Sequence, residues 1–316
     1  MKMYINTVSH YLPKKRVPNE YFKEVNGLSD SWIYERTGIK TRSKAGKDEN
    51  TNTMAIEAVR NALPSLPFDI RDVDLIVGAS YSPFDTVATI GHVVQREFHI
   101  KDAQVVYISS ACSSLINALE IVEGYFATGK SKQALVIASE HNTAFSNETC
   151  EKSGHLWGDG ATALFISDEP LGKKPAEILS IYSRGLGHIS KGPEAVYLTP
   201  GREGLQMPDG RDVFIQACQY MRVALEEASE LCGLGVDNLD WIIPHQANYR
   251  IINNLAKQLS LNEDKIFTNI KELGNTGSAS TGICLSQNME TIRKDDLLGI
   301  TVFGGGYSAG AAILRF

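Results

Sequence analysis

The chain is poor in cysteine, with five among 316 residues. The five stand at positions 112, 150, 218, 232 and 284, an odd number at irregular spacings with no Cys-x-x-Cys pair. This pattern predicts neither a disulfide framework nor a zinc site built on paired cysteines, and it favours a reducing compartment. We therefore expect no metal centre in this protein.

Long apolar runs and an excess of basic charge are also missing. No apolar run approaches the roughly 20 residues of a membrane span, and the first residues lead into a strand-like segment rather than a signal-peptide core. The formal net charge of -6 argues against nucleic acid as the main partner, because duplex binding depends largely on a basic surface. No Gly-x-Gly-x-x-Gly follows a strand-like run, so no redox cofactor is implied. We expect a soluble, cytoplasmic protein that binds neither membranes nor nucleic acid.

What is present is an internal duplication. Three apolar runs of the first half recur in the second at offsets of 166, about 164 and 150 residues. The pairs are 74–77 with 240–243, 134–138 with 298–302, and 160–166 with 310–316. Short strand-like runs that alternate with helical patterns indicate a buried sheet covered by helices. The pattern predicts an α/β fold of two similar βαβ-rich halves, 1–170 and 171–316, joined near the turn-rich segment 168–175.

Helical spacing of apolar residues identifies parts of the core. One stripe lies within Leu115–Phe126 and another runs from Phe214 to Cys232, each on one helical face. A third helical pattern covers Ala279–Thr291. The segment Gly185–Gly210 is rich in glycine, proline and charge, and we expect it to be a long excursion near the functional site.

Cys112 stands between a strand-like run and the first of these helices, in Ser-Ser-Ala-Cys-Ser-Ser. At the N-terminus of a helix, unpaired backbone N–H groups and the helix dipole favour a thiolate over a thiol. A lone cysteine in apolar surroundings is more often a small core residue. The flanking serines and two polar signatures downstream favour a nucleophile instead.

The two signatures are Pro244-His245-Gln246-Ala247-Asn248 and Gly274-Asn275-Thr276-Gly277-Ser278-Ala279-Ser280. Taken alone, a histidine at a strand end or an asparagine between glycines is weak evidence of function. In chain order with Cys112, however, they resemble the Cys-His-Asn set of the β-ketoacyl-acyl-carrier-protein synthase III family. This family is the initiating branch of the thiolase-like condensing enzymes.

The resemblance spans nearly the full chain. It includes Trp32-Ile33 with Glu35-Arg36-Thr37-Gly38-Ile39, the turn Gly158-Asp159-Gly160-Ala161, and the closing Phe303-Gly304-Gly305-Gly306 with Gly310-Ala311-Ala312. It implies a thiolase-like fold with the two halves in a layered αβαβα arrangement, and a homodimer. Asp159 has no second ligand at metal spacing, so we interpret it as part of a structural turn.

By this resemblance Cys112 takes an acyl group from acyl-coenzyme A and then condenses it with malonyl-acyl carrier protein. Neutral His245 and Asn275 stabilise the enolate formed when carbon dioxide leaves. The backbone N–H groups of Cys112 and Gly305 form the oxyanion hole. The product is a 3-oxoacyl-carrier protein of fatty acid or related polyketide-like biosynthesis, and no cofactor is needed.

The resemblance also implies substrate contacts. Trp32 and Arg36, four apart on one predicted helix, correspond to a pair that holds coenzyme A. Arg250 corresponds to a position that docks the acidic carrier protein, and Lys257 lies two turns further along. Val87 stands where a loop often carries phenylalanine and floors the acyl pocket across the dimer, so the pocket is expected to accept a primer longer than acetyl.

Some positions depart from the family pattern. An arginine that helps hold coenzyme A has no counterpart around Glu151-Lys152-Ser153, and Ser114 and Gly277 differ from the commonest residues. Three alternatives remain: an acyltransferase that does not decarboxylate, a cysteine hydrolase, and a non-catalytic partner of another synthase. Retention of Cys112, His245 and Asn275 argues against the first and third. The absence of a Cys-Gly-x-Cys-Trp motif argues against a papain-like hydrolase.

Overall fold

The computed structural model describes residues 2–199 and 204–316. Nine strands form one mixed sheet in the order β11-β12-β13-β8-β1-β7-β6-β4-β5. The strands contributed before residue 170 are β1 (Tyr4–Tyr11), β4 (Leu75–Ala79), β5 (Gln104–Ile108), β6 (Gln133–His141) and β7 (Asp159–Ser167). The later strands are β8 (Ala176–Gly185), β11 (Trp241–Pro244), β12 (Leu297–Gly304) and β13 (Ser308–Arg315).

The two groups of strands meet along a short seam, where β1 pairs with β8 only through Tyr4 and Ile5. Beyond the seam each group repeats one pattern: a parallel pair followed by an antiparallel neighbour. In the first group these are β4, β6 and β7, and in the second β11, β12 and β13. The three predicted sequence pairs therefore occupy matching strands. The exact boundary at residue 170 stays a prediction.

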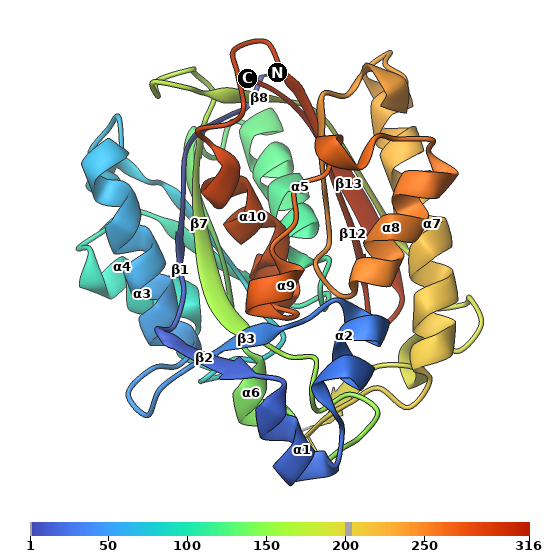
Figure 1. The fold of residues 1–316 in the computed structure, drawn as a ribbon. Coiled ribbons are helices and arrows are strands. Elements are labelled where there is room, and N and C mark those ends of the chain that lie inside the picture. Colours follow the sequence, from blue (N-terminus) through green and yellow to red (C-terminus); the bar gives the residue numbers. More distant parts are fainter. Residues whose placement is uncertain (1, 200–203) are drawn as a thin grey trace.

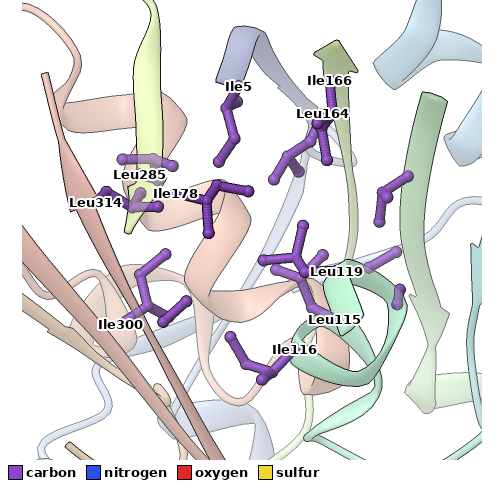
Figure 2. Packing of buried hydrophobic residues seen from close by; sticks show 14 of the residues in the cluster. Ile5, Leu115, Ile116, Leu119, Leu164, Ile166, Ile178, Leu285, Ile300 and Leu314 are labelled. Atoms are coloured by element: carbon purple, nitrogen blue, oxygen red, sulfur yellow. The ribbon is translucent and has the colours of Figure 1, made fainter. Parts of the chain in front are cut away.

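Helices α5 (Ser114–Ala127) and α10 (Ser280–Asn288) lie between the two groups of strands (Figure 1). Their apolar faces pack against strands of both groups in the largest core cluster, part of which is drawn in Figure 2. Leu115, Ile116 and Leu119 of α5 contribute to it, as does Leu285 of α10. Helix α10 ends at Asn288, three residues before the predicted end. The third of the five expected layers is thus a helical layer enclosed by strands.

The outer faces of the strands are covered by helices on either side (Figure 1). On the side of β4, β6 and β7 these are α3 (Thr51–Ala62) and α4 (Ile90–Glu97). On the side of β12 and β13 they are α7 (Gly210–Leu231) and α8 (Tyr249–Gln258). The order helix, strand, helix, strand, helix is the predicted αβαβα layering, and the α/β fold class is confirmed.

Short elements surround one end of these layers. They are α1 (Glu20–Asn26), α2 (Asp30–Thr37), α6 (Asn142–Phe145), α9 (Ile270–Leu273), the pair β2 (Lys15–Pro18) with β3 (Thr41–Lys44), and the pair β9 (Tyr197–Thr199) with β10 (Gly204–Gln206). The 3-10 turns are 63–65, 70–72, 192–194, 236–238, 263–265 and η6 (Gly277–Ala279). Among the described residues, no helix is long and apolar enough to cross a membrane.

Candidate active site

The nucleophile candidate sits in a tight turn that the flanking serines hold in place. The Ser114 hydroxyl accepts from the Ser110 backbone N–H at 2.9 Å and donates to the Ala111 carbonyl at 2.6 Å. The Ser113 hydroxyl donates to the Ser110 carbonyl at 2.6 Å. Ala111 has φ of 50°, a left-handed conformation that is unusual for a residue with a Cβ. The turn therefore fixes Cys112 immediately before α5.

Burial raises the pKa of the Cys112 thiol to about 12, and the nearby Glu140 carboxylate adds to the rise. The expectation that the helix N-terminus makes the thiolate the favoured form is therefore wrong. The Tyr81 hydroxyl and the backbone N–H of Cys112 act in the opposite direction, but their effect is smaller. In the resting protein the sulfur is a thiol, and its proton must leave during any acyl transfer.

His245 follows β11, where its backbone N–H bonds to the Thr301 carbonyl at 2.8 Å. The side chain is 3% exposed, and burial lowers its pKa to about 4, so the imidazole is neutral at pH 7. Its Nδ1 lies 2.8 Å from the Ser280 hydroxyl at the start of α10. When that hydroxyl donates the bond, the imidazole proton is on Nε2. His245 then offers one N–H group to the site.

Asn275 lies in the turn before α10 and is 5% exposed. Its Oδ1 accepts from the Gly277 backbone N–H at 2.9 Å, so the amide is oriented with Nδ2 left as a donor. Its backbone is tied to the other half: the carbonyl accepts from Gly158 N at 2.9 Å and from Asn142 Nδ2 at 3.2 Å. This loop therefore spans the two halves of the molecule.

One narrow cavity of about 100 Å³ joins the three residues. Cys112, His245 and Asn275 line it together with Gly304 and Gly305. Gly304 needs its missing side chain, because a Cβ there would lie 3.0 Å from the backbone nitrogens of both Cys112 and Ser113. Residues of α7 and of the start of α8 also line this cavity. Its further lining includes Leu156, Val213, Phe214, Ala217, Met221, Ala247, Asn248 and Ile251.

A second and roomier cavity, of about 290 Å³, is also lined by Cys112. Trp157, Val196 and Gly305 line both cavities as well. Other walls of the second come from the turn after β4 and from the excursion that the sequence predicted near the site. They include Tyr81, Ser109, Pro193, Tyr197, Leu198 and Leu205. The Cys112 sulfur therefore borders two cavities, a narrow one that it shares with His245 and Asn275 and a roomier one with a largely apolar lining.

Trp32 and Arg36 lie together on the surface of α2, as predicted. Ser29 accepts a hydrogen bond from the Trp32 backbone N–H at 3.2 Å and caps the helix. The Arg36 guanidinium lies 4.3 Å from the centroid of the Trp32 ring. The left-handed Gly38 ends α2 against Tyr249, the first residue of α8. Arg250 and Lys257 are exposed on α8, so the two predicted contact sets come from neighbouring helices.

The contribution of Val87 to an acyl pocket across the dimer stays a prediction. Its side chain is 84% exposed and lines neither cavity of this chain. The tight turn in which Asp85 accepts from the Val87 backbone N–H at 2.7 Å carries it outward. Asp159, interpreted as structural, is buried and accepts hydrogen bonds from Ala45 and Thr143. The described residues contain no group of three His, Cys, Asp or Glu side chains suited to a metal ion.

Sequence reasoning missed Tyr81 and Glu140, which lie beside Cys112. Tyr81 follows the carboxyl end of β4, and Glu140 is near the end of β6. Side chains at the carboxyl ends of neighbouring parallel strands converge, so their positions could have been singled out. No motif marked them.

A known protein family matches both parts of the chain that carry this site. The family described as 3-oxoacyl-[acyl-carrier-protein] synthase III matches residues 107–185, and its C-terminal part matches residues 230–316. The chain belongs to this synthase III family. It is therefore an acyltransferase-type condensing enzyme of fatty acid synthesis, and the resemblance that its motifs indicate is confirmed.

Relatives of this synthase III chain match it along nearly all its length. The β-ketoacyl-[acyl-carrier-protein] synthase III of Clostridium perfringens is 34% identical over 96% of both chains. The crystal structure of the synthase III from Aquifex aeolicus superposes with a TM-score of 0.92 at 32% identity and covers all of both chains. A priming β-ketosynthase from the R1128 polyketide pathway has a TM-score of 0.88 at 28% identity, covering 99% of this chain and 96% of its own.

Proposed function

We propose that this synthase transfers an acyl group from acyl-coenzyme A to Cys112 and condenses it with malonyl-acyl carrier protein, releasing carbon dioxide and a 3-oxoacyl-carrier protein. The observation that carries the proposal is a single cavity lined by a cysteine and two uncharged hydrogen-bond donors, His245 and Asn275. An uncharged pair suits an enolate, because both groups can donate without holding a net charge of their own.

In the loading step the Cys112 sulfur attacks the thioester carbonyl, a new C–S bond forms, and the coenzyme A thiolate leaves. The negative charge on the carbonyl oxygen is stabilised by the backbone N–H groups of Cys112 and Gly305. The proton of the Cys112 thiol passes to the departing coenzyme A thiolate. Because the thiol has a high pKa, proton loss accompanies attack rather than preceding it.

In the condensing step the malonyl C–C bond breaks and carbon dioxide leaves. The electron pair of the broken C–C bond forms an enolate whose oxygen accepts from His245 Nε2–H and Asn275 Nδ2–H. The enolate carbon attacks the acyl-Cys112 carbonyl, the C–S bond breaks, and the departing Cys112 sulfur takes up a proton from water. Decarboxylation drives the reaction forward, so our proposal includes no cofactor and no metal.

The second cavity supports a primer longer than acetyl. It is almost three times the volume of the first and is lined by apolar side chains such as Leu198 and Leu205. These residues, rather than Val87 of the same chain, line the acyl pocket in our proposal. Val87 contributes, in the same proposal, to the pocket of the partner subunit.

Partners follow from the surface around the narrow cavity. We propose that coenzyme A lies against Trp32 and Arg36, and that the acidic carrier protein docks on Arg250 and Lys257. A homodimer is supported by β5, whose outer edge pairs with no other described strand and carries half-buried apolar residues, and by the exposed Phe84. A cytoplasmic enzyme fits five unpaired cysteines.

The test incubates the protein with malonyl-carrier protein and acyl-coenzyme A thioesters of two to ten carbons, and measures carbon dioxide and product by mass spectrometry. We expect equal amounts of both, with rates that are highest above two carbons. Product without carbon dioxide would favour a non-decarboxylating acyltransferase, and free fatty acid alone would favour a hydrolase. No turnover and no acylation of Cys112 would favour a non-catalytic partner.

A further inference from the structure

Glu140 is a fully buried carboxyl group that has no cationic partner among the described residues. Its exposed fraction is 0%, and no ion pair joins it to any described Lys, Arg or His. Burying a lone carboxylate is costly unless hydrogen bonds replace its hydration. The loading and condensing steps do not use this group, so the reaction as derived above does not explain it.

Hydrogen bonds reach the Glu140 carboxylate from two separate turns. In the turn after β4, the Ser80 hydroxyl donates at 3.0 Å, the Tyr81 and Ser82 backbone N–H groups at 3.3 and 3.1 Å, and the Ser82 hydroxyl also donates. In the turn before α10, the Ser278 hydroxyl donates. One carboxylate thus joins a turn of the first half to the turn that carries Asn275.

Gly277 shows how closely these groups pack. It has φ of 59°, and a Cβ added there would lie 2.5 Å from the Tyr81 hydroxyl and 2.8 Å from Glu140 Cγ. A glycine at this position, one of the departures from the family pattern, therefore makes room for Tyr81. The Tyr81 hydroxyl makes no hydrogen bond of ordinary geometry, but it and Cys112 shift each other's pKa.

Three described titratable groups lie close enough to Glu140 to be affected by its charge. They are Tyr81 from the turn after β4, Tyr107 from β5, and Cys112 from the turn before α5. Strand β7 places Gly160 opposite it, and η6 contributes Ser278. Burial raises the pKa of Glu140 to about 7, against the opposing effect of the serine hydrogen bonds. Its charge therefore changes near neutrality while its three titratable neighbours remain protonated.

We propose that Glu140 is a positioning residue: by accepting hydrogen bonds from both turns at once, its carboxylate holds Tyr81 and Asn275 around the Cys112 sulfur and sets the reactivity of that sulfur. The negative charge of the ionised Glu140 carboxylate disfavours the Cys112 thiolate, whereas the Tyr81 hydroxyl favours the thiolate. The inference rests on the proposed role of Cys112 as the nucleophile.

The test measures alkylation of Cys112 by iodoacetamide from pH 6 to pH 9, resolved by peptide mass spectrometry. This reagent reports on the sulfur without requiring condensation. The variants are Glu140→Gln and, as a matched control, Glu123→Gln, which removes an exposed carboxylate from α5 about three turns beyond Cys112.

Glu140→Gln is expected to react at nearly the wild-type rate at pH 6, where Glu140 is mostly protonated. By pH 9 it is expected to react about tenfold faster, the change that corresponds to one pKa unit. Glu123→Gln is expected to follow the wild type throughout. A ratio of the Glu140→Gln rate to the wild-type rate that stays constant from pH 6 to pH 9 would overturn the proposal, since a merely structural role predicts no pH dependence.

Two further variants guard against loss of folding in Glu140→Gln. Ser278→Ala removes one donor to the carboxylate and should therefore raise the pKa of Glu140. In this variant, the slowing of alkylation by the ionised carboxylate should begin at a higher pH than in the wild type. Tyr81→Phe removes the hydroxyl that favours the thiolate, so alkylation should slow by a similar factor at every pH. Profiles of both variants that overlay the wild type would contradict the proposal. Normal alkylation profiles without any acyl loading would instead contradict the proposed function alone.

Discussion

The two halves of the molecule build the same strands and end them differently. Asp74, before β4, bonds through its backbone N–H to the Gln133 carbonyl at 2.9 Å, and Asp240, before β11, bonds likewise to Leu297 at 2.8 Å. The side chain of each aspartate also accepts from the partner strand's first backbone N–H. The start of the matching strands is therefore shared, and the divergence is confined to their carboxyl ends.

At those ends the halves divide the chemistry. Strand β11 is followed by His245, whereas β4 is followed by the serines and Tyr81 that surround Glu140. With the offset of 164 residues, Glu140 on β6 corresponds to Gly304 on β12. Gly304 lies against the Cys112 turn of the first half, and Glu140 lies against the Asn275 turn of the second. Each half supports the reactive turn of the other, one by absence of a side chain and one by a carboxylate.

The largest effect is expected from a substitution that blocks decarboxylation but leaves acyl loading intact. Asn275→Asp keeps the shape of the side chain but places a negative charge beside the developing enolate. We expect carbon dioxide release to fall by a factor of roughly 10³, as for loss of an oxyanion-hole donor. Acyl loading of Cys112, measured by intact-protein mass spectrometry, should persist. Loss of loading to the same degree would show that the halves do not divide the steps.

The core that the two halves share should unfold as one unit. Leu119→Ala on α5 and Leu285→Ala on α10 each empty space in the cluster between the strands. Each is expected to lower the free energy of unfolding by about 2–5 kcal/mol. Urea unfolding should remain a single transition in both variants. Separate transitions for the two halves would contradict a common helical layer.

A buried neutral histidine makes stability depend on pH. The pKa of His245 is about 4 in the folded protein, below its ordinary value near 6.5, so the unfolded chain binds a proton that the folded protein does not. Stability from this group is present above pH 6.5 and declines as the pH falls toward 4. Between pH 7 and pH 5 the loss is about 2 kcal/mol. His245→Gln should lack it in urea titrations at the two pH values; equal losses would contradict the assignment.

The smallest effects should distinguish the two surface cations. Arg36→Ala is expected to raise the KM for acyl-coenzyme A about fivefold, because one partly solvated cation contributes about 1 kcal/mol. Arg250→Ala should raise the KM for malonyl-carrier protein by a similar factor. Steady-state kinetics with each substrate varied in turn measures both KM values. Effects that fall on the same substrate would contradict separate binding surfaces.

Much of this arrangement is predictable from the sequence because it depends on local pattern. Apolar periodicity identified α5 and α7, and the duplicated runs gave the matching strands. Three motifs gave Cys112, His245 and Asn275 together. The exposure of a loop residue such as Val87 depends on the Asp85 turn, which apolar periodicity does not reveal.

What sequence reasoning could not supply is the electrostatic setting. The thiolate expected for Cys112 followed from the helix N-terminus alone. Burial and the carboxylate of Glu140, 28 residues away in the chain, outweigh that effect. Nor does any local signal reveal that Ser80, Ser82 and Ser278 converge on one carboxyl group, because the first two belong to one half and the third to the other.

The most direct test of the account follows the mass of the intact protein through one cycle. After incubation with a medium-chain acyl-coenzyme A, the wild type should gain one acyl mass and Cys112→Ala should gain none. Addition of malonyl-carrier protein should then remove that mass and release one equivalent of carbon dioxide. An acyl mass that persists after the addition, or that appears equally on Cys112→Ala, would contradict the account.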